Sequence, residues 1–343
     1  MATRTQLANR LTIANYFART HLENGLSLGA YDEQILHNTG LSTAQLAHPK
    51  ARILASQLAS IVRNCWRVSG DEMLGFTEQK LKLGMFSLLA EHLITCRTLE
   101  EVLDYIVRFY ALSGEQLRVK TQKNGAQLRL SLAPNFNEGR SKPVTKTLLI
   151  ELLLLICHRF CSWLVGQVIP LTKVCLNYAK PDHFQEYRLM FPSDCEFNSD
   201  DNALVFDAHY LDLSVVRHAD DLVNYLQEIP LPWFKKQSFF GPWTAQVMGL
   251  LEKESDIDKV ASQLNITSRT LRRKLTKEGS SFQQLKDQAR RDHAISLFDH
   301  HELTIAEIAL QVGFTESATF SRAFKQWTGV CPSSYRKQAL GPR

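Results

Sequence analysis

The stretch Val260-Ala261-Ser262-Gln263-Leu264-Asn265-Ile266-Thr267 returns 48 positions later as Ile308-Ala309-Leu310-Gln311-Val312-Gly313-Phe314-Thr315. Each copy has an apolar residue, an alanine, a turn-forming residue four positions after the alanine, another apolar residue and a threonine. Each copy continues into a basic amphipathic segment, with Arg273 and Arg322 at matching places. Because an internal repeat points to a duplicated supersecondary unit, we interpret this pattern as a helix-turn-helix written twice.

The turn of each copy carries a residue that tolerates a positive φ angle. Gly313 adopts such angles freely, and Asn265 belongs to the few other residue types that do so at modest cost. Four residues earlier, Ala261 and Ala309 are small enough for two helices to cross closely. A threonine after each turn, at 267 and 315, is expected to cap the second helix and leave its free N–H groups facing outward.

Apolar residues at helical spacing indicate a core for each copy. The inward stripes are Leu264, Ile266, Leu271 and Leu275 in the first copy and Val312, Phe314, Phe320 and Phe324 in the second. Thr304 to Glu307 forms a capping box that opens the first helix of the second copy. A connecting helix is expected between the copies, through Phe282, Leu285, Ala289 and Ile295. The sequence therefore predicts an all-α C-terminal domain with two helix-turn-helix units.

The exposed faces of the two second helices are the candidate DNA-binding surface, because the start of a recognition helix reaches base edges in the major groove. Base contacts are expected from Ser268, Arg269, Thr270, Arg272 and Arg273 in the first unit and from Ser317, Ala318, Ser321 and Arg322 in the second. Phosphate contacts are expected from Thr267, Lys274, Lys277, Thr315 and Lys325. The first helix is more basic, so it should provide more of the affinity.

The positive charge of the chain is concentrated in its last hundred residues. The net charge is +5, but residues 1–244 hold 25 Lys and Arg against 24 Asp and Glu, whereas residues 245–343 hold 15 against 11. The C-terminal end is thus the part suited to meet phosphate.

The length of 343 residues allows two domains, and 44% hydrophobic with 22% charged residues is ordinary for a globular protein. Pro230, Pro232, Gly241 and Pro242 crowd a stretch without helical or strand periodicity, which indicates a linker. We therefore divide the chain into a first domain (1–228), a linker (229–242) and a DNA-binding domain (243–343); the resemblance described below implies that the first domain is a sensor that binds an effector and dimerises.

The first domain mixes helices and strands without a regular βαβ alternation, so an α+β fold with an antiparallel sheet is expected. A hairpin should turn at Asn124-Gly125, between the alternating apolar residues of 117–121 and 128–132. Thr98 to Glu101 should start a helix inside the second helical block. The expected helices cover 6–22, 49–70, 86–112, 148–165 and 183–190, and the further strands cover 174–178 and 203–206.

Seven scattered cysteines without a Cys-x-x-Cys pair indicate reduced thiols in a cytosol. Cys157 and Cys161 are interpreted as core thiols, and no metal or cofactor is expected. The apolar run 148–157 is too short and too interrupted to span a bilayer, which needs roughly twenty apolar residues. We read it as a buried helix, and we expect a cytoplasmic protein without a membrane segment or an apolar signal core at its start.

Two motifs resemble a known family. Gly329-Val330-Cys331-Pro332-Ser333-Ser334-Tyr335-Arg336 matches the terminal Gly-x-x-Pro-x-x-Tyr-Arg signature of AraC/XylS-type transcription regulators, and Gly313-Phe314 with Phe320-Ser321-Arg322-Ala323-Phe324 matches their second unit. Residues 245–339 therefore resemble the DNA-binding domain of that family. Roughly residues 25–210 are similar to the arabinose-binding-like sensor domain of such regulators, through Phe191 to Phe197, Asn202 to Phe206 and Leu211.

The resemblance implies a transcription regulator whose first domain binds a small metabolite such as an amino acid or a fatty acid. We expect an activator that binds double-stranded DNA as a homodimer and contacts RNA polymerase. The sequence assigns no effector-binding residue, and Phe86, Phe109 and Tyr110 could belong to the core or to a pocket. A sugar-binding cupin is not expected, because the helical content is too high.

Two other functions compete with this interpretation. His158 and Cys161 lie three residues apart on an apolar helix, but no third orienting residue accompanies them, so no catalytic residue is assigned and an enzyme is not expected. The alternative among DNA-binding proteins is a nucleoid-type protein that binds DNA regardless of sequence and without an effector.

Overall fold

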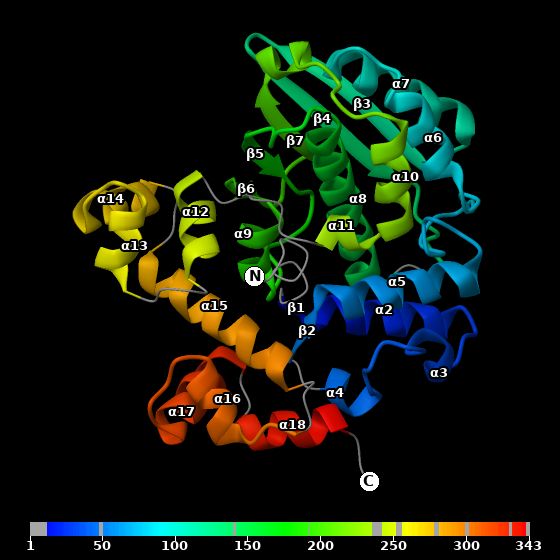
Figure 1. Cartoon of the computed structure of the whole chain (residues 1–343). Helices are drawn as coiled ribbons and strands as arrows, with labels where there is room; N and C mark the ends of the chain where they lie inside the picture. The colour runs from blue at the N-terminus through cyan, green and yellow to red at the C-terminus, as the bar shows by residue number, and fades with distance from the viewer. Residues whose placement is uncertain are drawn as a thin grey trace. The chain divides into compact units, whose positions relative to one another are not determined.

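The computed structural model (Figure 1) describes residues 12–47, 51–139, 142–191, 193–234, 242–251, 256–277, 281–298, 302–328 and 331–340. They form two compact units. The sheet unit consists of the described residues of Tyr16–Gly40 and Ser56–Gln237, and the helical unit of those of Met1–Asn15, Leu41–Ala55 and Ser238–Arg343. All seven cysteines are free. The division of the chain at 228 and 243 stays a prediction.

The sheet unit is built on a five-stranded sheet, which confirms the α+β expectation. The strands are β3 (Leu117–Asn124), β4 (Gln127–Pro134), β5 (Leu171–Cys175), β6 (Cys195–Glu196) and β7 (Asn202–Asp207). Their order is β3-β4-β7-β5-β6, and every neighbouring pair is antiparallel except the parallel pair β5 and β6.

The predicted hairpin is present, but its turn lies one residue later than expected. Asn124 pairs with Gln127, so the two turn residues are Gly125 and Ala126 instead of Asn124 and Gly125. Gly125 has a φ of 59°, and a glycine adopts this left-handed conformation without strain. Extending the strand through Asn124 adds one more cross-strand pair, which explains the shift.

Helices and 3-10 turns accompany this sheet in the sheet unit. They are α2 (Asn15–Ser27), α3 (Asp32–Ile35), α5 (Ala55–Ser69), α6 (Met85–Leu93), α7 (Leu99–Ser113), α8 (Pro143–Leu164), η1 (Phe184–Glu186), α9 (Tyr187–Met190), η2 (Ala208–Asp212), α10 (Ala219–Glu228) and α11 (Leu231–Phe234). The cap predicted at Thr98 is confirmed, since its side chain accepts a 3.3 Å hydrogen bond from the Glu101 N–H at the start of α7.

Helix α8 is the buried helix that the sequence predicted. It packs on β4 and β7. Among the described helices it is the one that is long and apolar enough to span a membrane, yet 72% of its apolar window is buried inside the protein. Its apolar residues therefore belong to the core of the sheet unit.

Two expected helices begin later than predicted. Thr12–Ala14 forms strand β1, which pairs antiparallel with β2 (Arg52–Leu54) through Ile13 and Ile53. Helix α2 therefore starts at Asn15, and α5 starts at Ala55 instead of Pro49. β-branched residues favour strands, and here the tertiary pairing overrides the helical pattern. Residues 1–11 and 48–50 lie outside the described residues.

The helical unit contains the repeats. Its helices are α4 (Thr43–Ala47), α12 (Pro242–Leu250), α13 (Ile257–Gln263), α14 (Ser268–Lys277), α15 (Phe282–Leu297), α16 (Ile305–Gln311), α17 (Ser317–Thr328) and α18 (Pro332–Leu340). The long helix α15 runs between the group α12–α14 and the group α16–α18 (Figure 1). Strands β1 and β2 belong to this unit as well, and α4 packs against α18.

Candidate nucleic-acid interface

The two predicted turns have the same main-chain hydrogen bonds. The Ile266 N–H donates to the Ala261 carbonyl (3.0 Å), and the Phe314 N–H donates to the Ala309 carbonyl (2.9 Å). One residue earlier, the N–H of Asn265 and that of Gly313 each donate 3.0 Å bonds to a carbonyl three positions back. This pair of bonds is a Schellman motif. It requires a left-handed residue, and φ is 55° at Asn265 and 82° at Gly313.

Each turn is held on a separate apolar core, and helix α15 supplies residues to both. The predicted stripes are inward, as expected. The first core contains Val260, Ala261, Leu271, Leu275 and Leu285, with Leu264, Ile266 and Ala289 packed against it. The second contains Ala294, Ile295, Ile308, Ala309, Val312, Phe320 and Phe324, with Phe314 packed against it. The connecting helix thus fixes both recognition helices to one element.

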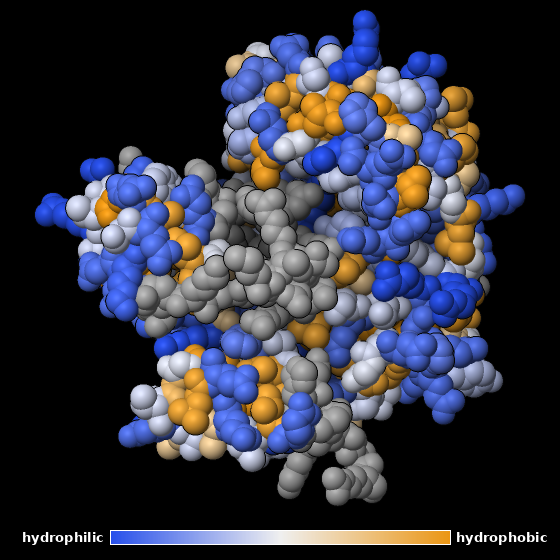
Figure 2. Space-filling model, in the orientation of Figure 1, coloured by the Kyte–Doolittle hydropathy of each residue, from blue (hydrophilic) through white to orange (hydrophobic). Residues whose placement is uncertain are grey.

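The first recognition helix, α14, presents the predicted arginines to solvent. Arg269, Arg272 and Arg273 are exposed, and Ser268 and Thr270 are half-buried. The predicted cap is confirmed, because the Thr270 N–H donates a 3.2 Å hydrogen bond to the Thr267 hydroxyl. Figure 2 shows hydrophilic residues over the surface of α13 and α14.

The second recognition helix, α17, exposes Ser317, Ala318 and Arg322, while Ser321 is half-buried and Lys325 is exposed. The cap predicted at Thr315 was wrong. The helix begins at Ser317, so Glu316 directly precedes it, because this turn is one residue longer than the first. Thr315 itself is exposed and could still meet a phosphate.

The structure also reveals contacts that the sequence did not indicate. The Lys274 ammonium lies 3.8 Å over the ring of Trp243 on α12, so this predicted phosphate ligand also braces α14. On α15, the Arg290 guanidinium donates a 2.9 Å hydrogen bond to the Gly313 carbonyl. The side chain of Lys277 lies outside the described residues. Neither contact leaves a periodicity or a short motif in the sequence.

The helical unit is completed by the short strands from the start of the chain. The Arg52 guanidinium donates to the Thr12 hydroxyl (3.0 Å) and to the Thr12 carbonyl (2.9 Å). The Arg52 carbonyl in turn accepts a 2.8 Å hydrogen bond from the Tyr335 hydroxyl on α18. Leu54 packs against the second apolar core. The strand pair is therefore part of the scaffold that holds the second unit.

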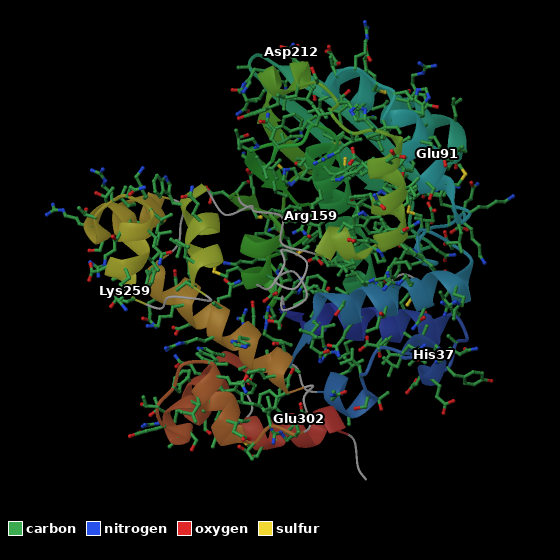
Figure 3. The ribbon with its side chains drawn as sticks, viewed as in Figure 1. His37, Glu91, Arg159, Asp212, Lys259 and Glu302 are labelled. Carbon is green, nitrogen blue, oxygen red and sulfur yellow. The ribbon has the colours of Figure 1, made fainter. Side chains whose placement is uncertain are left out.

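His158 and Cys161 are both buried in the core of the sheet unit. The imidazole of His158 donates from Nε2 to the Ile169 carbonyl at 2.7 Å, and burial lowers its pKa to about 4. A hydrogen bond with Cys157, together with burial, raises the pKa of the Cys161 thiol well above its usual value. Such a thiol stays protonated and unreactive. Arg159 beside them on α8 (Figure 3) is also buried, and burial lowers its pKa to about 9.

Phe86 and Tyr110 line an apolar cavity of about 50 Å³ in the sheet unit, whereas Phe109 is not among its lining residues. The cavity is partly open to solvent and is lined by helices α6, α7 and α8 and by strands β3 and β4, for example through Leu132 and Leu153. None of the lining residues carries a charge.

Comparisons with known proteins agree with both halves of the resemblance. Residues 29–215 match the family described as the arabinose-binding domain of AraC transcription regulators, and residues 260–338 match a helix-turn-helix domain family. The chain is 24% identical over 299 residues to the ornithine utilization regulator of Pseudomonas aeruginosa, covering 85% of this chain and 86% of that protein. It is 40% identical over 99 residues to an uncharacterized HTH-type transcriptional regulator of Mycobacterium tuberculosis, covering 28% of this chain and 29% of that one. Among solved structures, it is similar to the transcriptional regulator CdpR from Pseudomonas aeruginosa, with a TM-score of 0.31, 21% identity, and coverage of 73% and 80%.

Proposed function

This chain belongs to the family of AraC transcription regulators with an amino-terminal arabinose-binding domain, and from this premise we propose that it is a sequence-specific activator controlled by a small-molecule effector. It is a transcription regulator and not an enzyme. The observation that carries the proposal is the pair of turns with the same Schellman hydrogen bonds, each followed by a helix with exposed polar residues.

Each of the two recognition helices would contact a different part of one operator. An arginine can hold guanine O6 and N7 bidentately, which is worth about 1–3 kcal/mol of discrimination. Arg269, Arg272 and Arg273 on α14 give the first unit more such donors than Arg322 gives the second. We therefore propose that α14 supplies most of the affinity, and that α17 reads a second major groove about 34 Å along the duplex.

Effector control rests on the sensor domain and on its cavity. A ligand changes the population of DNA-competent states only through a different affinity for each state. The uncharged lining around Phe86 and Tyr110 suits an apolar group, since an unpaired charge is costly to bury. The apolar part of a metabolite such as a fatty acid would fit this chemistry. We further propose a cytoplasmic homodimer that contacts RNA polymerase.

The proposal is tested by selecting duplexes from a randomised pool with the full-length protein. Two preferred half-sites about one helical turn apart are expected. Replacing Arg273 and Arg322 together by alanine should remove the preference at both half-sites and reduce the salt dependence of binding. The matched control is Lys259→Ala, which removes a positive charge from α13 (Figure 3) without touching a recognition helix. Selection of no common sequence by the wild-type protein would favour the nucleoid-type alternative.

A further inference from the structure

Arg290 on the connecting helix α15 makes two contacts with the turn of the second unit. Its guanidinium donates a 2.9 Å hydrogen bond to the Gly313 carbonyl. It also lies 4.8 Å from the centroid of the Phe314 ring, a cation–π distance. A Cβ placed on residue 313 would come within 3.1 Å of the Arg290 Nη2 atom. The φ angle of residue 313 therefore favours a glycine, and a side chain there would also require the Arg290 guanidinium to shift by a few tenths of an ångström.

The contact continues into the recognition helix. The Phe314 ring lies 5.6 Å from that of Phe320 and 5.9 Å from that of Trp327, both on α17. Phe320 is fully buried in the second core. Because packed rings hold one another in fixed orientations, a movement of Phe314 would tilt α17 and displace Ser317 and Arg322 on its outer face.

The first unit has different residues at the equivalent positions. Asn265 stands in place of Gly313, and Ile266, which has no aromatic face to receive a cation, stands in place of Phe314. Its recognition helix is instead braced through the contact of Lys274 with Trp243. The two units therefore share a backbone turn but differ in how each is fixed to the rest of the helical unit.

We propose that Arg290 is a positioning residue for DNA reading, which orients the second recognition helix on α15 without itself contacting DNA. This inference rests on the proposed DNA-binding function and adds a residue outside both recognition helices. The first unit then serves as an internal control, because the hydrogen bond and the ring contact of Arg290 both join it to the second unit.

The test compares half-site preferences of full-length variants on duplexes selected by the wild-type protein. Arg290→Met keeps much of the side chain's bulk but removes the hydrogen bond and the charge. We expect it to weaken discrimination at the second half-site about ten-fold, by the usual size of such contacts, and to leave the first unchanged. Arg290→Lys keeps the charge over the ring and should restore part of the loss. Lys259→Met is the charge-matched control.

A double-mutant cycle separates positioning from a general loss of folding. Phe314→Leu should give the same defect, and combining it with Arg290→Met should add little, because both act through one contact. Equal weakening of both half-sites by Arg290→Met, or no weakening at all, overturns the inference. Failure of the wild-type protein to select any sequence would overturn the proposed function instead, so the two failures are distinguishable.

Discussion

The hydroxyl of Thr12 donates a 2.6 Å hydrogen bond to the carboxylate of Asp292, a residue 280 positions further along the chain. Both residues are buried. Asp292 also forms a 3.0 Å ion pair with Arg291, while Arg52 donates to the Thr12 hydroxyl. The start of the chain and the connecting helix are thus tied by a polar network in which Thr12 is the central member.

Thr12→Val tests this network, because valine keeps the shape of threonine and removes only the hydroxyl. It should lower the free energy of unfolding of the helical unit by about 1–3 kcal/mol, since a buried carboxylate loses a donor and a buried guanidinium loses an acceptor. The measurement is urea unfolding together with hydrogen exchange of α15. Thr95→Val, at an exposed position, is the control, and an unchanged α15 in the Thr12 variant would contradict the prediction.

The two turn residues should differ in their response to alanine. Asn265→Ala should cost about 1 kcal/mol, because alanine tolerates a φ of 55° less well than asparagine. Gly313→Ala should cost more, since its Cβ would also meet the Arg290 guanidinium at 3.1 Å. Thermal unfolding of both variants gives the order. Asn265→Gly should be close to neutral, and a larger loss for Asn265→Ala than for Gly313→Ala would count against this account.

Filling the apolar cavity should block an apolar ligand. Leu153→Phe adds volume to the lining, whereas Leu112→Phe makes the same change on a side chain that is 85% exposed. We expect 1-hexanol to raise the thermal midpoint of the wild-type protein and of Leu112→Phe, and to leave Leu153→Phe unchanged. Hexanoate should bind more weakly, because the lining has no cation to pair with its charge. Equal shifts for Leu153→Phe would place the binding elsewhere.

Two buried histidines should make the sheet unit sensitive to acid. Burial lowers the pKa of both His21 and His158 to about 4, against about 6.5 in an unfolded chain. Between these values the unfolded chain binds protons that the folded protein does not, so stability falls as the pH is lowered from about 6.5 to 4. Each histidine lowers the free energy of unfolding by roughly 3 kcal/mol as the pH falls across this window.

The check is urea unfolding at pH 7, 5.5 and 4. His158→Gln should flatten the pH dependence, while the exposed His37→Gln (labelled in Figure 3) should leave it unchanged. The prediction is wrong if the wild-type protein and His158→Gln lose stability in parallel.

Local chemistry explains which parts of the fold could be predicted. The turns at Asn265 and Gly313 were predictable because few residues accept a positive φ. The start of α7 was predictable because Thr98 caps it through the N–H of Glu101, only three residues later. The pairing of β1 with β2 could not be read in the same way, because each strand has three residues and their partners lie about forty positions apart.

The exposed residues of α14 and α17 were predictable for the same reason, since exposure follows the phase of each helix. The contacts that hold these two helices in place were not predictable. Arg290 meets Gly313 across 23 positions, and nothing in the periodicity of α15 says which of its polar residues faces the second turn. The cap expected at Thr315 failed because one extra residue in that turn shifts the start of α17, a difference that no capping rule resolves.

Helix α15 supplies side chains to both apolar cores. The number of residues between these side chains therefore fixes the rotation of one core relative to the other around the axis of α15. One residue inserted between Ala289 and Ala294 would rotate the second core by about 100° around the helix axis and advance it by about 1.5 Å. Such a rotation would turn one recognition helix away from the face of the DNA duplex that the other is proposed to contact. Under the proposed function, the number of residues between Ala289 and Ala294 of α15 would set the spacing of the two half-sites.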